Sequence, residues 1–210
     1  MSRTLAQLRA SVRANINASP PEIGDVVLNE FINQAIDNAI TDHLLVPLVD
    51  ENLIWIESTY EYELENSPTP GNLDLLVYIY QIFEESETSG VFYSGPIPYS
   101  YWDVQSGSPP YLRFYTEGGL GISGRNLRIV GAGHQARVSA DLDEIHLPPD
   151  YVIWKACSLA HGRLSGSTSP QRASWHGQQI QISEGRAENS RIQAHEWKLP
   201  NMYRYIWGRL

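Results

Sequence analysis

The sequence has little cysteine, few basic side chains and no long apolar run. Cys157 is the only cysteine in 210 residues, so no disulfide can form within the chain. Acidic residues outnumber lysine and arginine by 24 to 15, and the net charge of −9 argues against a basic face that wraps nucleic acid. No segment has the apolar length of a membrane span or of a signal-peptide core. We expect a protein that stays in the cytosol until it is assembled into something larger, without a membrane partner.

Familiar catalytic signatures are also missing, such as G-x-S-x-G and H-E-x-x-H. One nucleotide-binding pattern is present, because Gly119, Gly121 and Gly124 spell G-x-G-x-x-G. That fingerprint requires a helix after the glycines, since the helix N-terminus holds the phosphates. Here the segment "NLRIVG" follows and has the pattern of a strand, and no Walker lysine is found. We therefore interpret the glycines as the loop of a β-hairpin and expect no bound cofactor.

One short segment gathers side chains of metal-ligand type. Asp141, Asp143, Glu144 and His146 fall within six residues, and such a group can hold a divalent cation. The segment lacks the spaced glycine and the final glutamate of a calcium loop. We interpret it as an acidic, solvated loop that leads into a helix, and we expect no metal.

The remaining candidates for chemistry are isolated. Cys157 and His161 are four residues apart, a spacing that suits two ligands or a nucleophile with its base. No second pair accompanies them, so we expect both side chains to pack in the core. His176 follows Trp175 and is interpreted as a packing contact as well. The sequence therefore predicts no catalytic residue, and we expect that the protein is not an enzyme.

Hydrophobic periodicity predicts helices toward both ends of the chain. Apolar residues recur at intervals of three and four in residues 4–16 and again in residues 25–43. Pro148 and Pro149 suit the entrance of another long helix, which ends at "SGSTSP". Residues 171–195 are polar but compatible with a helix.

The middle of the chain has the patterns of strands. Residues 54–65 alternate between apolar and acidic side chains, which predicts a half-buried strand. The segment "LDLLVYIYQIF" is apolar on both faces and suits a central strand, and "YLRFYT" and "NLRIVG" predict two more. Residues 87–110 are rich in Ser, Gly, Pro and Tyr, a composition that predicts a long loop with at most one short strand. The solvated face of residues 54–65 carries Glu57, Glu61, Glu63 and Glu65.

Together these patterns predict an α+β fold. Residues 1–48 plus 148–195 would form a helical bundle, residues 49–147 an inserted antiparallel β-rich subdomain, and residues 196–210 an extended C-terminal tail. Aromatic and arginine side chains are common anchors of protein interfaces, so we expect the tail to bind a partner or a neighbouring subunit. The tail residues in question are Trp197, Tyr203, Arg204, Tyr205, Ile206, Trp207, Arg209 and Leu210.

Three segments together resemble the head-to-tail adaptor (neck or connector) proteins of tailed bacteriophages. These are "FINQAIDNAI" in the first long helix, the aromatic and glycine-rich "YLRFYTEGGLGISGRNLRIVG", and "DEIHLPPDYVIWKACSLAHGRL", with an acid and Leu-Pro before a helix of small residues. Their order and spacing carry the resemblance. The long loop at 87–110 departs from the family's pattern.

The resemblance implies a structural virion protein at the head–tail interface, made in the host cytoplasm. Such adaptors form a ring, usually of twelve copies, between the portal protein and a downstream tail or neck protein. Genomic DNA passes through the ring without specific binding, and an acidic lining repels phosphate. The four glutamates would then face the channel or a neighbouring subunit, and the C-terminal tail would reach the portal.

Three other functions remain open at this point. A tail-completion or terminator protein has a similar role at another position in the virion. A metal-dependent phage enzyme would rest on Asp141 to His146, and a glycan-binding module on the tyrosine-rich loop.

Overall fold

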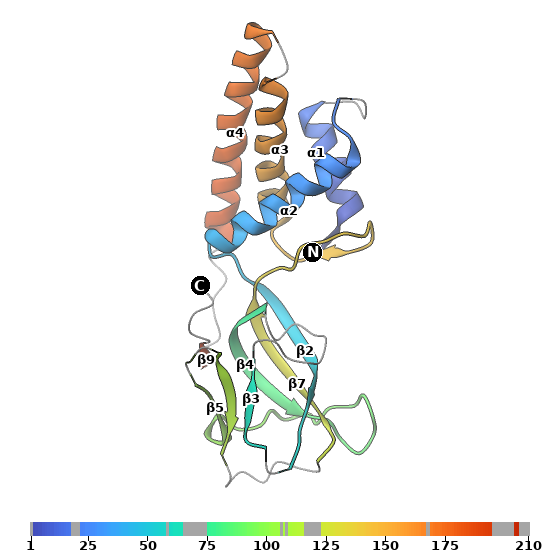
Figure 1. Ribbon diagram of the computed structural model, residues 1–210, viewed down its shortest axis with the longest axis vertical. Helices are drawn as coiled ribbons and strands as arrows, with labels where there is room; N and C mark the ends of the chain where they lie inside the picture. The colour runs from blue at the N-terminus through green and yellow to red at the C-terminus, as the bar shows by residue number, and fades with distance from the viewer. Residues whose placement is uncertain are drawn as a thin grey trace. The chain divides into compact units, whose positions relative to one another are not determined.

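The computed structural model describes residues 2–17, 22–57, 59–64, 75–105, 107, 109–115, 123–166 and 169–194, and the backbone of 204–205. Within these residues the chain has four α-helices and only antiparallel strand pairs, which confirms the α+β prediction. It divides into two compact units (Figure 1). The helical unit comprises Met1–Leu45 with Gln135–Lys198, and the β unit comprises Val46–His134 with Leu199–Leu210. The chain thus re-enters the helical unit at Gln135, before the predicted position 148, and the end of the tail belongs to the β unit.

The helical unit consists of α1 (Leu5–Ile16), α2 (Asp25–Thr41), α3 (Pro149–Ser165) and α4 (Pro170–Ala194). α3 contacts each of the other three helices, and Figure 1 shows α1 and α4 on opposite sides of it. The predicted helices are confirmed because their apolar stripes are buried. The buried members in the first two helices are Leu5, Leu8, Val12, Ile16, Leu28, Phe31, Ile32, Ala35, Ile36 and Ala39.

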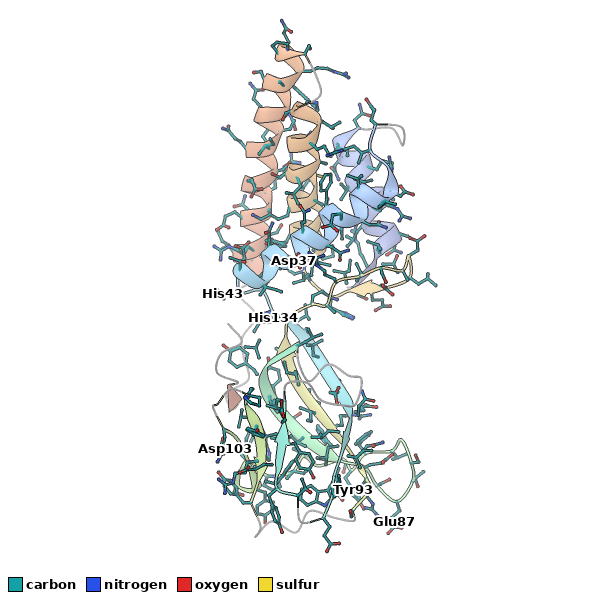
Figure 2. The ribbon with its side chains drawn as sticks, in the orientation of Figure 1. Asp37, His43, Glu87, Tyr93, Asp103 and His134 are labelled. Atoms are coloured by element: carbon teal, nitrogen blue, oxygen red, sulfur yellow. The ribbon has the colours of Figure 1, made fainter. Side chains whose placement is uncertain are left out.

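The helix ends follow local chemistry. Thr4 and Gln7 form a capping box at the start of α1, with the Thr4 hydroxyl accepting the Gln7 N–H at 3.3 Å. At the end of α2, Leu44 N–H donates to the Ala39 carbonyl and His43 N–H to the Ile40 carbonyl. His43 has a φ of +56°, so these bonds form a Schellman ending with histidine where glycine is usual. His43 is labelled in Figure 2.

The asparagine in "FINQAIDNAI" connects α2 to a distant segment. The Asn33 amide donates to the Val138 carbonyl and accepts the Val138 N–H, both at 2.9 Å, and its side chain is buried. One turn later, Asp37 (Figure 2) pairs with Arg137 through two hydrogen bonds. Residues 137 and 138 are therefore held against α2 from a sequence distance of about a hundred residues.

Two sheets build the β unit. The larger has the order β2 (Val46–Ile54), β7 (Asn126–Gly133), β4 (Leu76–Glu84) and β9 (Arg204–Tyr205). The smaller has the order β3 (Glu61–Glu63), β6 (Tyr111–Phe114) and β5 (Trp102–Gln105). Both contribute to one core, in which Trp55 meets the Phe114 ring edge-on at 5.4 Å and Trp102 is fully buried. The central position of β4 and the short strand β5 within the long loop are as predicted.

The predicted strand at 54–65 is wrong. β2 ends at Ile54, and Ile54 and Ile56 are 44% and 52% exposed, whereas Trp55 between them is 5% exposed. The Tyr62 hydroxyl accepts the Ile56 N–H at 2.9 Å and stabilises a turn that carries the chain from the larger sheet to the smaller one. The alternation therefore restarts at β3 with Tyr62 facing the core.

The predicted hairpin around the glycines is also wrong. β6 and β7 lie in different sheets and do not pair with each other. Gly119 and Gly121 lie outside the described residues, and Gly124 has a φ of +91° and donates its N–H to the Trp55 carbonyl at 2.8 Å. β7 follows at Asn126, so the helix that a dinucleotide fingerprint needs does not follow Gly124.

Candidate functional site

The predicted acidic face is only partly described. Glu57, Glu61 and Glu63 are exposed, and Glu65 lies outside the described residues. Glu61 and Glu63 project from the same face of β3, where Glu61 lies 3.7 Å from Arg113 on the paired strand. The exposed carboxylates thus remain candidates for a channel surface or a contact between subunits.

The described part of the C-terminal tail belongs to the β unit. Tyr205 pairs with Tyr78, and Arg204 pairs with Ile79, on the edge of β4 that β7 does not occupy. This pairing covers the edge of β4 at Tyr78 and Ile79, and further along the strand the Ile82 and Glu84 carbonyls accept the Ile97 and Tyr93 N–H groups. The rest of the predicted interface lies outside the described residues: Trp197, Tyr203, Ile206, Trp207, Arg209 and Leu210.

The acidic loop at 141–146 supports the start of α1. The Asp143 carboxylate accepts the N–H groups of Ser139 and Ala140, each at 2.8 Å, and these bonds lower its pKa. The Asp143 carbonyl also accepts the Leu5 N–H at 3.0 Å, which satisfies an amide in the first turn of α1. The Asp143 carboxylate, one of the four candidate metal ligands of this loop, thus accepts backbone N–H groups.

Arg9 connects this loop to α2. Its guanidinium lies 3.0 Å from Asp141 and 3.6 Å from Asp25. The residues that follow these two acids, Leu142 and Val26, are 83% and 82% exposed. We name these two exposed side chains, Val26 and Leu142, the apolar knob; each directly follows an acid that Arg9 contacts.

α3 and α4 bring two histidines together in the helical unit. The Nδ1 atoms of His161 and His176 are 3.1 Å apart, and the residues are 2% and 6% exposed. Burial is the largest cause that lowers both pKa values, with His176 contributing to the shift of His161 and Arg172 to that of His176. Trp175 meets both rings edge-on, at 5.5 Å from His161 and 4.9 Å from His176.

The histidine pair is not predicted from the sequence, because His161 and His176 are fifteen residues apart and lie on different helices. His176 shares the inward face of α4 with Ser183 and Ala187, at spacings of seven and eleven residues. That spacing is the signal that places His176 toward α3. The register between the two helices, which no local pattern contains, then sets the distance to His161.

The alternative pairing of Cys157 with His161 is not formed. The Cys157 thiol points to the Val12 carbonyl at 3.9 Å, and burial raises the thiol pKa to about 12. A protonated thiol is neither a nucleophile nor a metal ligand. Cys157 therefore packs in the core, as predicted from the sequence.

A small hollow opens beside the histidine pair. Its volume is about 100 Å³, and it is formed by the end of α1, the end of α3 and the start of α4. The lining residues are Ile16, Asn17, Glu22, Leu164, Arg172, Trp175 and His176. The hollow thus gives one of the two buried imidazoles a path to small solutes.

α4 carries the longest solvent-facing surface of the helical unit. Only His176, Ser183 and Ala187 of its 25 residues are buried. One exposed flank, which we name the α4 flank, contains no acid, and its Trp175 and Ile182 are 46% and 45% exposed. Its members recur at intervals of three and four: Gln171, Trp175, Gln178, Ile182, Arg186, Asn189 and Gln193.

The acids of α4 lie on the other side of the helix. Glu184 pairs with Lys155 at 2.8 Å, and Glu188 pairs with Arg191 at 2.6 Å. On the flank itself, the Arg186 guanidinium sits 4.3 Å from the centre of the Trp154 ring. The flank is therefore apolar and amide-rich, and Arg186 is its one charged residue.

No protein-family model matches the chain, and no curated protein is detectably similar to it in sequence. Within the residues that the structure describes, no three side chains of His, Cys, Asp or Glu converge as a metal cluster. None of the described helices is long and apolar enough to cross a membrane.

Proposed function

We propose that the chain is a structural subunit of a bacteriophage head-to-tail adaptor, which associates with copies of itself into a ring. The α4 flank is the observation that carries this proposal. Copies of a chain with a net charge of −9 repel one another, so a surface on which they meet must be poor in acids. The α4 flank meets that condition and presents Trp175 and Ile182 to solvent.

A closed ring requires two different surfaces on each subunit, because one self-complementary patch gives only a dimer. The apolar knob supplies the second surface. Val26 lies in the first turn of α2, and the loop that carries Leu142 accepts the Leu5 and Ala6 N–H groups of α1. Val26 and Leu142 offer exposed apolar side chains to Trp175 and Ile182 of the α4 flank.

In this proposal the ring, usually of twelve copies in such adaptors, joins the portal protein to a downstream tail or neck protein in the virion. Glu57, Glu61, Glu63 and Glu65 keep DNA moving by repelling its phosphates. The tail residues beyond β9 bind the portal or the next subunit.

A disulfide experiment tests the ring contact. Leu142→Cys and Ile182→Cys chains are oxidised separately and then as a mixture, with the buried Cys157 unchanged. We expect cross-linked dimers only in the mixture. Dimers from Ile182→Cys alone would show two α4 helices in a self-complementary contact, which contradicts a ring built in this way.

Imaging then tests the role. A chain with both cysteines is oxidised with its own portal and viewed by negative stain. We expect a closed ring on the portal. A ring that binds only tail tubes would indicate a tail-completion protein, and a chain that stays monomeric with both partners would contradict the proposal.

A further inference from the structure

We propose that His161 and His176 form a binding site for one divalent transition-metal ion of the kind that imidazole prefers: zinc, nickel or copper. The proposal does not depend on the ring, because both ligands lie between α3 and α4 of a single chain. The two histidines supply the protein ligands, and the hollow beside them supplies room for the others.

The separation of the two Nδ1 atoms matches a shared metal. A zinc–imidazole bond is about 2.0–2.1 Å long, so two nitrogens on one ion at 90–109° are about 2.8–3.4 Å apart. The observed separation of 3.1 Å lies in this range. An ion can therefore bind between the rings with little movement of α3 or α4.

The environment keeps the ligands in the required protonation state. Burial disfavours the imidazolium form, and a neutral imidazole is the form that binds metals. Without metal, one Nδ1 must donate and the other accept. With metal, both rings carry their proton on Nε2, so one neutral ring changes tautomer and no proton need be lost.

The hollow provides access and further ligands. It reaches His176, Asn17 and Glu22 are among its lining residues, and it can admit water to the open coordination positions. Arg172 lines the same hollow, and its positive charge opposes that of the ion, whereas the Glu22 carboxylate offsets it. This balance and the small number of protein ligands predict an exchangeable ion and not a permanently held one.

Metal titration of the 210-residue chain without an affinity tag tests the site. Zinc, nickel and copper are each added to chelator-treated protein, and binding is followed by equilibrium dialysis and by thermal unfolding. We expect one ion per chain, a rise in Tm with metal, and at least tenfold weaker binding to His176→Gln. Copper should also quench Trp175 fluorescence, and Trp175→Phe should lose most of that quenching while keeping the ion.

Two exposed histidines provide the matched controls. His43→Gln and His146→Gln should bind as the unchanged protein does. X-ray absorption on the unchanged protein gives a readout that needs no variant, and we expect two imidazoles around each zinc. Equal affinity of the unchanged protein and His176→Gln, or a zinc without two imidazoles, would overturn the site.

Discussion

At the scale of single residues, two glycines of β7 are fixed by the backbone of β4. A Cβ at Gly131 would collide with the Tyr78 carbonyl oxygen and lie 2.7 Å from Leu76 Cδ2. A Cβ at Gly133 would collide with the Leu75 carbonyl oxygen in the same way. The strand pairing shifts register between Leu76 and Tyr78, which moves the β4 backbone toward these positions.

We predict that Gly131→Ala lowers the free energy of unfolding by about 1–3 kcal/mol, because backbone atoms of β4 must move to accept the methyl group. Urea unfolding measures the change. Gly185→Ala in α4 is the control: its added Cβ meets open space, and removing glycine from a helix should stabilise the protein by about 0.5–1 kcal/mol. Equal effects of Gly131→Ala and Gly185→Ala on the free energy of unfolding would contradict a steric collision at Gly131.

A second residue-scale prediction concerns acid. The pKa of Asp143 is lowered in the folded state, so its carboxylate adds stability above the ordinary pKa of 3.8 and loses it as the pH falls below that value. Asp143→Asn should therefore be less stable than the unchanged protein at pH 7, and the difference should shrink toward pH 3. Glu144→Gln is the control, since that carboxylate accepts only an exposed contact from the Ser2 hydroxyl among the described hydrogen bonds. If the stability difference between Asp143→Asn and the unchanged protein stays constant with pH, the hydrogen bonds from Ser139 and Ala140 do not depend on the charge of this carboxylate, and the prediction is wrong.

At the scale of elements, two hydrogen bonds with Asn33 hold the Val138 backbone against α2. Asn33→Ala leaves the Val138 N–H and carbonyl buried without their partner, and we predict a loss of about 2–3 kcal/mol. Asn38→Ala, at an exposed position of the same helix, should change stability by less than about 0.5 kcal/mol. Chemical unfolding measures the free energy of unfolding of both variants. Similar losses for Asn33→Ala and Asn38→Ala would contradict a structural role for the Asn33 amide.

Elements with a regular pattern of their own could be predicted from the sequence. The stripes of α1 and α2, the two prolines at the start of α3 and the apolar run of β4 each identify an element without help from the rest of the chain. β2 was missed because Pro47 and the register shift between Asp50 and Leu53 interrupt its alternation.

Contacts between distant elements could not be predicted in this way. The placement of β6 and β7 in different sheets depends on partners far along the chain, and so does the meeting of His161 with His176. The turn at Ile56 depends on the Tyr62 hydroxyl, which a strand pattern treats only as an apolar face. The candidate metal site belongs to this second kind of feature and became visible only with the fold.

At the scale of the whole molecule, the C-terminal tail contributes to the β unit. Removing residues 196–210 exposes the edge of β4 at Tyr78 and Ile79. We predict faster hydrogen exchange of the β4 amides in the truncated chain and a greater tendency to self-associate. Hydrogen-exchange mass spectrometry and light scattering measure both, and unchanged exchange in β4 would show that β9 adds no protection.

The pairing of Val46 with Gly133 has a consequence for the order of folding. These two residues lie at the two ends of the inserted β segment. When β2 and β7 pair, the end of the sequence that contains α1 and α2 is therefore brought close to the start of the sequence that contains α3 and α4. For an unstructured loop of this length, closing the ends costs roughly 4 kcal/mol. A β unit that folds first has already closed this loop, so α1 and α2 then pack on α3 without a further closure cost.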